Sequence, residues 1–142
     1  MPRESIAMTY EAVLAVLEEE RWAALGTVDP DAGVWPDIVP MMMEGERVYF
    51  RVPAGSRSHA NIQRDDRVCC AVDRYPTYYE IKGITAHGHA TPVGADVAER
   101  VSRALDGVGD PIDAAAKNEG LIYSIGLDDL TSFDFAKIKR QY

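Results

Sequence analysis

The sequence predicts a mainly β protein with flanking helices, whose strands form a six- to seven-stranded antiparallel barrel. Two observations lead to this fold class. Apolar runs of strand length recur along the 142 residues, and clusters of Gly, Pro, Asp and Glu separate most of them. Apolar residues with helical spacing are confined to a few stretches. Six or seven strands at such intervals favour a closed or nearly closed antiparallel barrel.

The first third of the chain predicts a helix followed by an antiparallel meander. Thr9 is suited to cap the helix, because a threonine side chain accepts a hydrogen bond from the first turn. Three strands joined by short turns are expected next, at residues 22–28, 34–43 and 47–52. Pro36 and Pro40 fall inside the second strand, which predicts a bulged or splayed strand with unpaired backbone groups.

The rest of the chain supplies the remaining elements. A short helix, two strands, a second helix and two final strands are expected at 59–64, 68–72, 78–92, 95–105, 121–127 and 130–135. Gly83 and Gly88 lie inside the long strand, where glycine suits a coiled, barrel-forming sheet or the close approach of a ligand. Pro111 is suited to begin a further short helix. No repeat or linker interrupts the pattern, so residues 1–142 are expected to form one domain.

Composition limits the classes of partner. The 15 basic and 23 acidic side chains give a net charge of −8, which disfavours nucleic acid and acidic membrane surfaces. No stretch approaches the ~20 apolar residues of a membrane span, and the first residues lack the apolar core of a signal peptide. Cys69 and Cys70 are adjacent, and neighbouring strand residues point to opposite faces, so both are expected to be reduced in a cytoplasmic protein.

The junction after the third strand is the strongest candidate site. The strand stops at Pro53 and Gly55, and Ser56, Arg57 and Ser58 follow immediately. Hydroxyls, free backbone N–H groups and a guanidinium at one corner are what a phosphate needs, so a phosphorylated cofactor is a candidate ligand. The serines equally suit helix capping, and Arg57 equally suits a solvated helix start. No nucleophile, general acid or general base stands out elsewhere.

Three other patterns have a functional and a structural interpretation. His87 and His89 share one face of a strand, but no third ligand lies nearby in sequence, so no metal site is predicted. The methionines at 41–43 suit either a pliable wall for a planar ring or simple core filling. Trp35 and the tyrosines within 75–79 suit either ring stacking or a dimer interface.

The order of these motifs resembles the pyridoxamine 5′-phosphate oxidase-like family, the FMN-binding split barrels. The resemblance covers roughly residues 9–93 and rests on several short motifs in the expected sequence order: 24–29, Gly33, Pro36, 38–40, 48–50, Ser56-Arg57 with Asn61, 64–68, and 87–90 with Pro92. Each motif alone is weak, whereas their joint order and spacing are fairly specific for the fold.

The resemblance implies a split β-barrel and a homodimer with two FMN sites at the subunit interface. It implies that basic and hydroxyl residues at the corner after the third strand hold the phosphate, and that the flavin ring lies along the second strand. By position, Ser56 and Arg57 match the phosphate corner and Asn61 matches the small helix beneath it. The residues that match the ring-lining stretch are Val39, Pro40 and Met41.

Two positions depart from the family pattern. Ser58 stands where the family often has lysine, and Arg51 stands where it often has threonine. Arg51 could restore the missing positive charge, and Lys82 is a weaker candidate for the same role. Alternatively, the departures indicate a different cofactor or none. Ser58 is retained as a candidate hydroxyl donor to the phosphate.

The resemblance implies an FMN-dependent oxidoreductase that acts on a small molecule, with no catalytic side chain assigned. Two alternatives remain open. A deazaflavin-dependent reductase would use the same fold, but the acidic tail of its coenzyme needs a broader basic channel. A non-catalytic dimeric protein that binds flavin or haem is favoured by the loss of lysine at Ser58.

Overall fold

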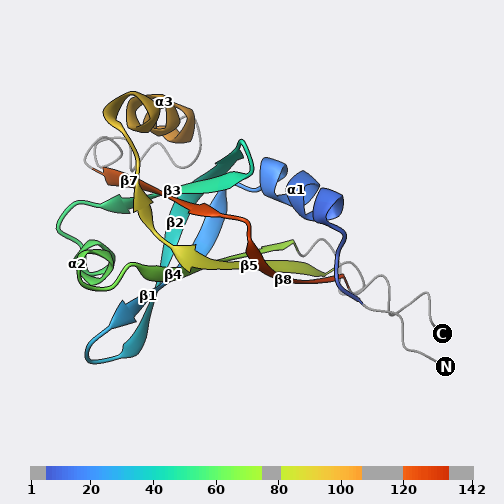
Figure 1. The fold of residues 1–142 in the computed structure, drawn as a ribbon, viewed down its shortest axis with the longest axis horizontal. Helices are drawn as coiled ribbons and strands as arrows, with labels where there is room; N and C mark the ends of the chain where they lie inside the picture. The colour runs from blue at the N-terminus through green and yellow to red at the C-terminus, as the bar shows by residue number, and fades with distance from the viewer. Residues whose placement is uncertain (1–5, 75–80, 107–119, 135–142) are drawn as a thin grey trace.

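The computed structural model describes residues 6–74, 81–106 and 120–134, and the structural statements below concern these ranges. Within them the chain forms three helices and eight strands (Figure 1). In chain order they are α1 (Tyr10–Glu19), β1 (Trp22–Asp29), β2 (Gly33–Glu44), β3 (Arg47–Pro53), α2 (Arg57–Arg64), β4 (Arg67–Arg74), β5 (Lys82–His89), β6 (Thr91–Pro92), α3 (Ala95–Asp106), β7 (Gly120–Gly126) and β8 (Asp129–Asp134).

The strands form one antiparallel sheet in the order β6-β7-β3-β2-β1-β4-β5-β8, which confirms the predicted fold class with slightly more strands than expected. The extra strand comes from the long strand predicted over 78–92. Its described part divides into β5, which pairs with β4 and β8, and β6, which pairs with β7. Ala90 separates them, and its N–H donates to the Asp66 carbonyl at 2.7 Å. The helix predicted from Pro111 lies outside the described residues.

The sheet curls into a split barrel because some chain segments pair with a strand of one half of the sheet and then continue to pair with a strand of the other half. β2 pairs with β1 along residues 33–40 and with β3 along 41–44. The segment from β5 to β6 changes partners in the same way, and so does the segment from β7 to β8. These shared segments bring the inner faces of the two halves together around one core.

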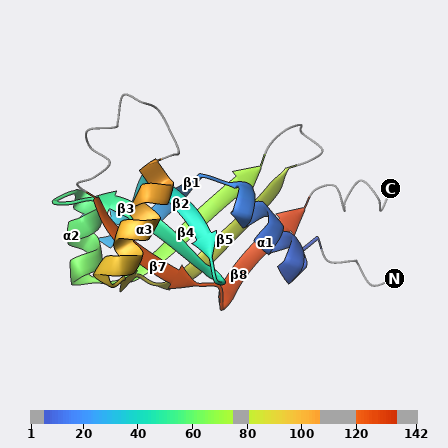
Figure 2. The ribbon, with the colours of Figure 1, turned by 90° about the horizontal axis from the view of Figure 1, so that it is seen from above.

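The core follows the alternation of buried and exposed residues along the strands. Its most deeply buried large side chains include Leu25, Met41, Phe50 and Ile125. The helices α1 and α2 lie at opposite ends of the molecule and insert apolar side chains into this core (Figures 1 and 2). The third helix, α3, instead packs outside the barrel, where its Val101 and Leu105 cover β7. No helix in the described ranges has the length and apolar character that a membrane crossing requires.

The predicted bulge in β2 is not found, because its register with β1 runs without a skipped residue. The Met41 N–H donates to the Arg21 carbonyl at 2.9 Å, so this pair is a hydrogen-bonded one. Hydrogen-bonded and non-hydrogen-bonded pairs alternate along an antiparallel ladder. Pro36 and Pro40 therefore fall at non-hydrogen-bonded positions, where the missing N–H costs no bond to β1.

One face of the β1–β2 hairpin is apolar and has no described helix over it. We call it the open sheet face, and its residues are Trp22, Ala24, Gly26 and Val28 of β1 with Val34, Pro36, Ile38 and Pro40 of β2. Val34 is 61% exposed and Ile38 is 67% exposed. Such large apolar side chains in one uncharged patch are typical of an interaction surface.

Gly83 is predicted to be indispensable for the packing of β8 on β5. A Cβ at Gly83 would lie 2.2 Å from Cε1 of Phe133, so the group that closely approaches this glycine is a side-chain ring of the protein itself. Gly83→Ala should therefore lower the free energy of unfolding by about 1–3 kcal/mol through overpacking. Gly88→Ala is the matched control on the same strand, since its Cβ would meet Ile125 at an ordinary 3.7 Å. Equal stability of the two variants in urea denaturation would contradict this account.

Candidate functional site

The corner between β3 and α2 is built by a glycine turn and a helix cap. Gly55 adopts φ +76°, which favours glycine, and its N–H donates to Nδ1 of His59 at 3.0 Å. The Ser56 hydroxyl accepts from the His59 N–H at 3.2 Å and so caps α2. The capping role considered for Ser56 is therefore present in the structure.

Asp29, at the end of β1, is the centre of a hydrogen-bond network that fixes this corner. Its carboxylate accepts two bonds from Arg57, from Nε at 2.7 Å and from Nη2 at 2.8 Å. It also accepts from the Asp31 and Ala32 N–H groups at 3.0 and 2.8 Å, and from Nδ2 of Asn61 at 3.1 Å. Charge-assisted bonds of this kind are the strongest that side chains make.

This network also explains the electrostatics of the ion pair. The Arg57 guanidinium and the Ala32 N–H hold the pKa of the Asp29 carboxyl well below its usual range. The same carboxylate raises the pKa of Arg57. The Arg57 guanidinium additionally lies 4.0 Å from the centroid of the Trp35 ring, in a cation–π contact. Arg57 is thus fixed by the β1–β2 hairpin, although its side chain remains 44% exposed.

Ser58 and Asn61 are buried beneath the corner instead of facing outward. The Ser58 hydroxyl donates to Oδ2 of Asp37 at 3.1 Å, and the Asn61 amide donates to Oγ1 of Thr27 at 3.0 Å. Ser58 is 0% exposed and Asn61 is 1% exposed. Their polar atoms therefore hold α2 against β1 and β2.

Taken together, these contacts use part of the hydrogen-bonding capacity of the corner. Arg57, Ser58 and Asn61 already donate to protein acceptors through their side chains. Two of those acceptors, Asp29 and Asp37, are carboxylates, which would repel a phosphate dianion. Asp29 takes only Nε and Nη2 of Arg57, and the Ser56 hydroxyl accepts in its bond to His59, so Nη1 of Arg57 and the Ser56 hydroxyl proton are still available to a ligand. The phosphate assignment therefore stays a prediction.

The structure places Arg51 away from the corner. Residues alternate along β3, so that Phe50 and Val52 enter the core while Arg51 points to α3. Its Nη1 donates to Oδ1 of Asp106 at 2.8 Å and to the Ser102 hydroxyl at 3.2 Å. Arg51 is only 5% exposed. It therefore anchors α3 and does not restore positive charge at the corner.

Lys82 also lies away from the corner. It is the first residue of β5 and pairs in register with Arg74 of β4. Arg74 in turn forms salt bridges with Glu19 and Glu20 at the end of α1. Since α1 and α2 lie at opposite ends of the molecule, Lys82 and the α2 corner do not meet within one subunit (Figure 1).

The expected ring-lining residues divide between the two faces of β2. Val39 and Met41 point inward and are buried in the core, so core filling is the observed role of Met41. Pro40 lies on the open sheet face and is partly exposed. Only Pro40 among these three presents its side chain to a ligand on that face.

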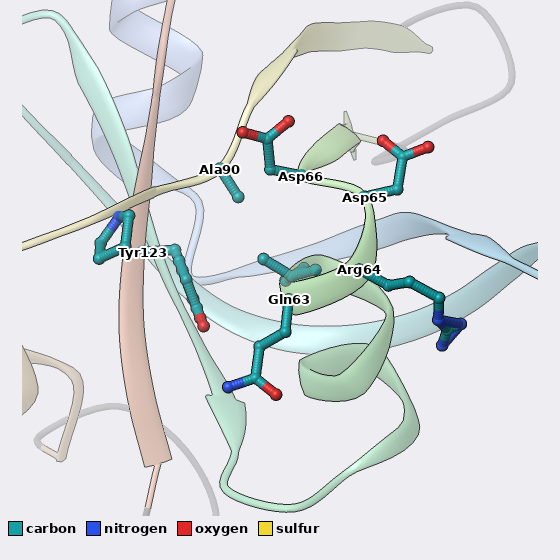
Figure 3. Close-up of a pocket in the computed structure, with 8 residues that line it drawn as sticks. Gln63, Arg64, Asp65, Asp66, Ala90 and Tyr123 are labelled. Carbon is teal, nitrogen blue, oxygen red and sulfur yellow. The ribbon is translucent and has the colours of Figure 1, made fainter.

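Two cavities of about 620 Å³ are lined by residues other than those predicted to bind a cofactor. The first lies beside α2 and is lined by Ile62, Gln63, Arg64, Asp65, Asp66, Ala90, Pro92 and Tyr123. Figure 3 shows the Tyr123 side chain pointing toward Gln63 while Arg64 points away from it. Burial raises the pKa of the Tyr123 hydroxyl, and its ring stacks on Phe50 with centroids 6.0 Å apart.

The second cavity lies beside β5 and β8. Its lining includes His87 and His89, the two histidines predicted to share one face of a strand. His89 contacts Oδ1 of Asp66 through Nδ1 at 2.6 Å. Among the described residues, no group of three His, Cys, Asp or Glu side chains is placed to hold a metal ion. Neither cysteine forms a disulfide, as expected, and burial raises the pKa of the Cys70 thiol to about 12.

The architecture described above defines a class of protein, the antiparallel split barrels with helices at both ends. A family model described as pyridoxamine 5′-phosphate oxidase matches residues 9–118, which is more than half of the chain. The chain therefore belongs to the pyridoxamine 5′-phosphate oxidase-like family, and the resemblance found in the sequence is confirmed. A search of curated proteins finds no match.

Several solved structures share this fold. A conserved hypothetical protein from Mycobacterium tuberculosis is 20% identical with a TM-score of 0.80, covering 98% of this chain and 92% of that one. A FAD-binding protein from Mesorhizobium loti is 14% identical with a TM-score of 0.69, covering 90% and 96%. A structure named F420 reductase is 18% identical with a TM-score of 0.63, covering 82% and 94%. At these identities the likeness concerns the fold.

The Asp29–Arg57 pair is predicted to stabilise the fold in a pH-dependent way. Because the folded-state pKa of Asp29 is depressed, its contribution is complete above the ordinary aspartate pKa of about 4 and is lost as the pH falls below it. Arg57→Met keeps the apolar stem over Trp35 but removes the ion pair. The variant should unfold at lower urea concentration at pH 7 and show a shallower loss of stability between about pH 5 and pH 2.

The control for this prediction is Arg67→Met, which breaks an exposed pair with Asp65 at 2.6 Å. Exposed pairs contribute little, so this variant should lose less stability at pH 7 than Arg57→Met. If both variants lose the same stability at pH 7, Arg57 does not have the structural role assigned here.

Proposed function

We propose that the protein is a homodimeric oxidoreductase that holds a flavin-type ring where its two subunits meet. The observation that carries this proposal is the open sheet face, an exposed apolar surface on the β1–β2 hairpin in a chain of this family. Family membership supports the class of activity. The names of two structural neighbours, a FAD-binding protein and an F420 reductase, support a flavin or deazaflavin ring as the cofactor class.

The register of the strands makes the open sheet face broad and flat. Ile38 lies opposite Ala24, which lies opposite Ala71 of β4. In the next row, Pro36 lies opposite Gly26 and Gly26 opposite Cys69. Large side chains on β2 thus border a strip of small ones on β1 and β4. A second copy of the chain suits this face, because a two-fold dimer buries the same patch on both subunits.

The roles of the chain in this proposal are binding, orientation and exclusion of water. Ala24 is small and leaves room for a planar ring on this face, whereas Cys69 and Val34 lie close over Gly26. Ile38 and Pro40 provide apolar walls beside the ring. When bound, a flavin supplies hydride or electron transfer, and the protein supplies its binding and surroundings. A small organic molecule or a nicotinamide cofactor is the partner class for such chemistry.

The deazaflavin alternative is less well supported by the charges. A long acidic coenzyme tail needs unpaired cations, but Arg51 and Arg57 already pair with carboxylates. The non-catalytic alternative, a dimer that binds a flavin or haem, is favoured by the same observation, that Arg57 at the α2 corner already pairs with Asp29.

The visible absorption spectrum tests the proposal directly. Purified protein is incubated with riboflavin, FMN, FAD or a deazaflavin coenzyme, freed of excess, and scanned before and after anaerobic addition of NADH or NADPH. We expect a retained flavin band that bleaches on reduction. A retained band that neither donor bleaches would favour non-catalytic binding, and failure to retain any of these cofactors would overturn the proposal.

Dimerisation through the open sheet face yields a separate prediction. Ile38→Glu places a charge at the centre of the apolar face and should shift the protein to monomers by at least tenfold in the dissociation constant, since burying an unpaired charge is costly. Leu121→Glu is the control, because Leu121 is also exposed but lies on β7. Sedimentation velocity over a range of concentrations measures the shift. A wild-type monomer, or an unchanged Ile38→Glu dimer, would contradict the assignment of this face.

A further inference from the structure

We infer that the cavity beside α2 is a binding site for an uncharged aromatic ring that carries an amide group. The observation that carries this inference is the Tyr123 side chain, which lines the cavity and whose hydroxyl has no hydrogen-bond partner among the described residues. The inference goes beyond the proposed function, because this cavity shares no residue with the open sheet face.

The packing of the Tyr123 ring fixes the direction of its hydroxyl. Only 7% of Tyr123 is exposed, and its ring stacks on Phe50 with 22° between the ring planes. Tyr123 lies in register with Phe50 of β3 on one side and with Pro92 of β6 on the other. From this position the side chain points toward Gln63 of α2 (Figure 3). A polar group that enters the cavity can therefore bond a nearly buried hydroxyl that the described protein leaves unbonded.

The two neutral polar groups of the lining match an amide. Burial raises the pKa of the Tyr123 hydroxyl, so the group is protonated at neutral pH and can donate. The Gln63 amide is exposed and can both donate and accept. The carbonyl of a ligand amide can accept from Tyr123, and its N–H can donate to Oε1 of Gln63.

The apolar part of the lining and the size of the cavity suit a ring. Ile62 is 4% exposed and Ala90 is 3% exposed, so both present apolar surface that is already excluded from bulk water. Pro92 adds a flat side chain next to Tyr123. The volume of about 620 Å³ lies within the range of roughly 300–1,000 Å³ that is typical of small-molecule sites.

The charged groups of the lining disfavour an anion. Asp65 and Asp66 both line the cavity, whereas Arg64 points away from Tyr123 (Figure 3). The partners of the two carboxylates, Arg67 and His89, line the second cavity and not this one. A carboxylate or phosphate on the ligand would be repelled by Asp65 and Asp66, but an uncharged amide would not.

The experiment is a titration of the purified protein with benzamide and with benzoate, followed by two-dimensional NMR of the backbone amides. The two probes share one ring, and benzoate replaces the amide group with a carboxylate. We expect benzamide to shift the signals of Ile62, Gln63 and Ala90 and to bind about tenfold more tightly than benzoate.

Two variants test the assigned contacts. Tyr123→Phe keeps the ring on Phe50 and removes only the hydroxyl, so benzamide should bind about fivefold more weakly. The variant should unfold at an unchanged or higher urea concentration, because the hydroxyl has no described protein partner to lose. Gln63→Leu removes the exposed amide and should weaken benzamide by a similar factor. Tyr49→Phe is the matched control, since Tyr49 packs with the α3 cluster outside the barrel, and it should leave the affinity unchanged.

Several outcomes would overturn the inference. These are the absence of benzamide binding, shifts confined to the open sheet face, equal affinity for benzoate, and an affinity that Tyr123→Phe leaves unchanged. None of them depends on whether the protein retains a flavin, so the inference and the proposed function can fail separately.

Discussion

Asp29 joins the tip of the β1–β2 hairpin to the first turns of α2 through five hydrogen bonds, two of them to Arg57. The site depends on this junction. It orients α2 at one end of the barrel, buries Asn61 beneath it, and holds Arg57 over Trp35. A buried carboxylate is stable only with its cation and hydrogen-bond donors in place, so the corner cannot rearrange one residue at a time.

This junction gives the protein two contrasting surfaces close together. The corner is polar, and Nε and Nη2 of Arg57 are bound internally by Asp29. The open sheet face on the other side of the same hairpin is apolar and exposed, with Ile38 near its centre. In the proposed function, binding energy for a ring or a second subunit would come from apolar burial on this sheet face. A second ion pair, between the buried Arg51 and Asp106, fixes α3 independently of both surfaces.

The sequence was sufficient for the order of helices and strands, the fold class and the family, because these follow from local periodicity and turn residues. Nothing local in the sequence singles out Asp29. Its bonds to Asp31 and Ala32 are local, but its pairing with Arg57 spans 28 positions and depends on the sheet register. The pairing of Arg51 with Asp106 could not be foreseen for a related reason: alternation places Arg51 opposite the core residues of β3, but nothing local indicates that α3 covers that side. The partner change at Ala90 likewise depends on how the barrel closes.

The most direct test of the account is the ionisation of Asp29 itself, followed by carbon-detected NMR of its carboxyl group as the pH is lowered. The account predicts that this signal stays that of the carboxylate down to about pH 2.5, well past the point near pH 4 at which an ordinary aspartate takes up its proton. A midpoint near pH 4 would contradict it, because Asp29 would then lack the bonds to Arg57 that fix the corner.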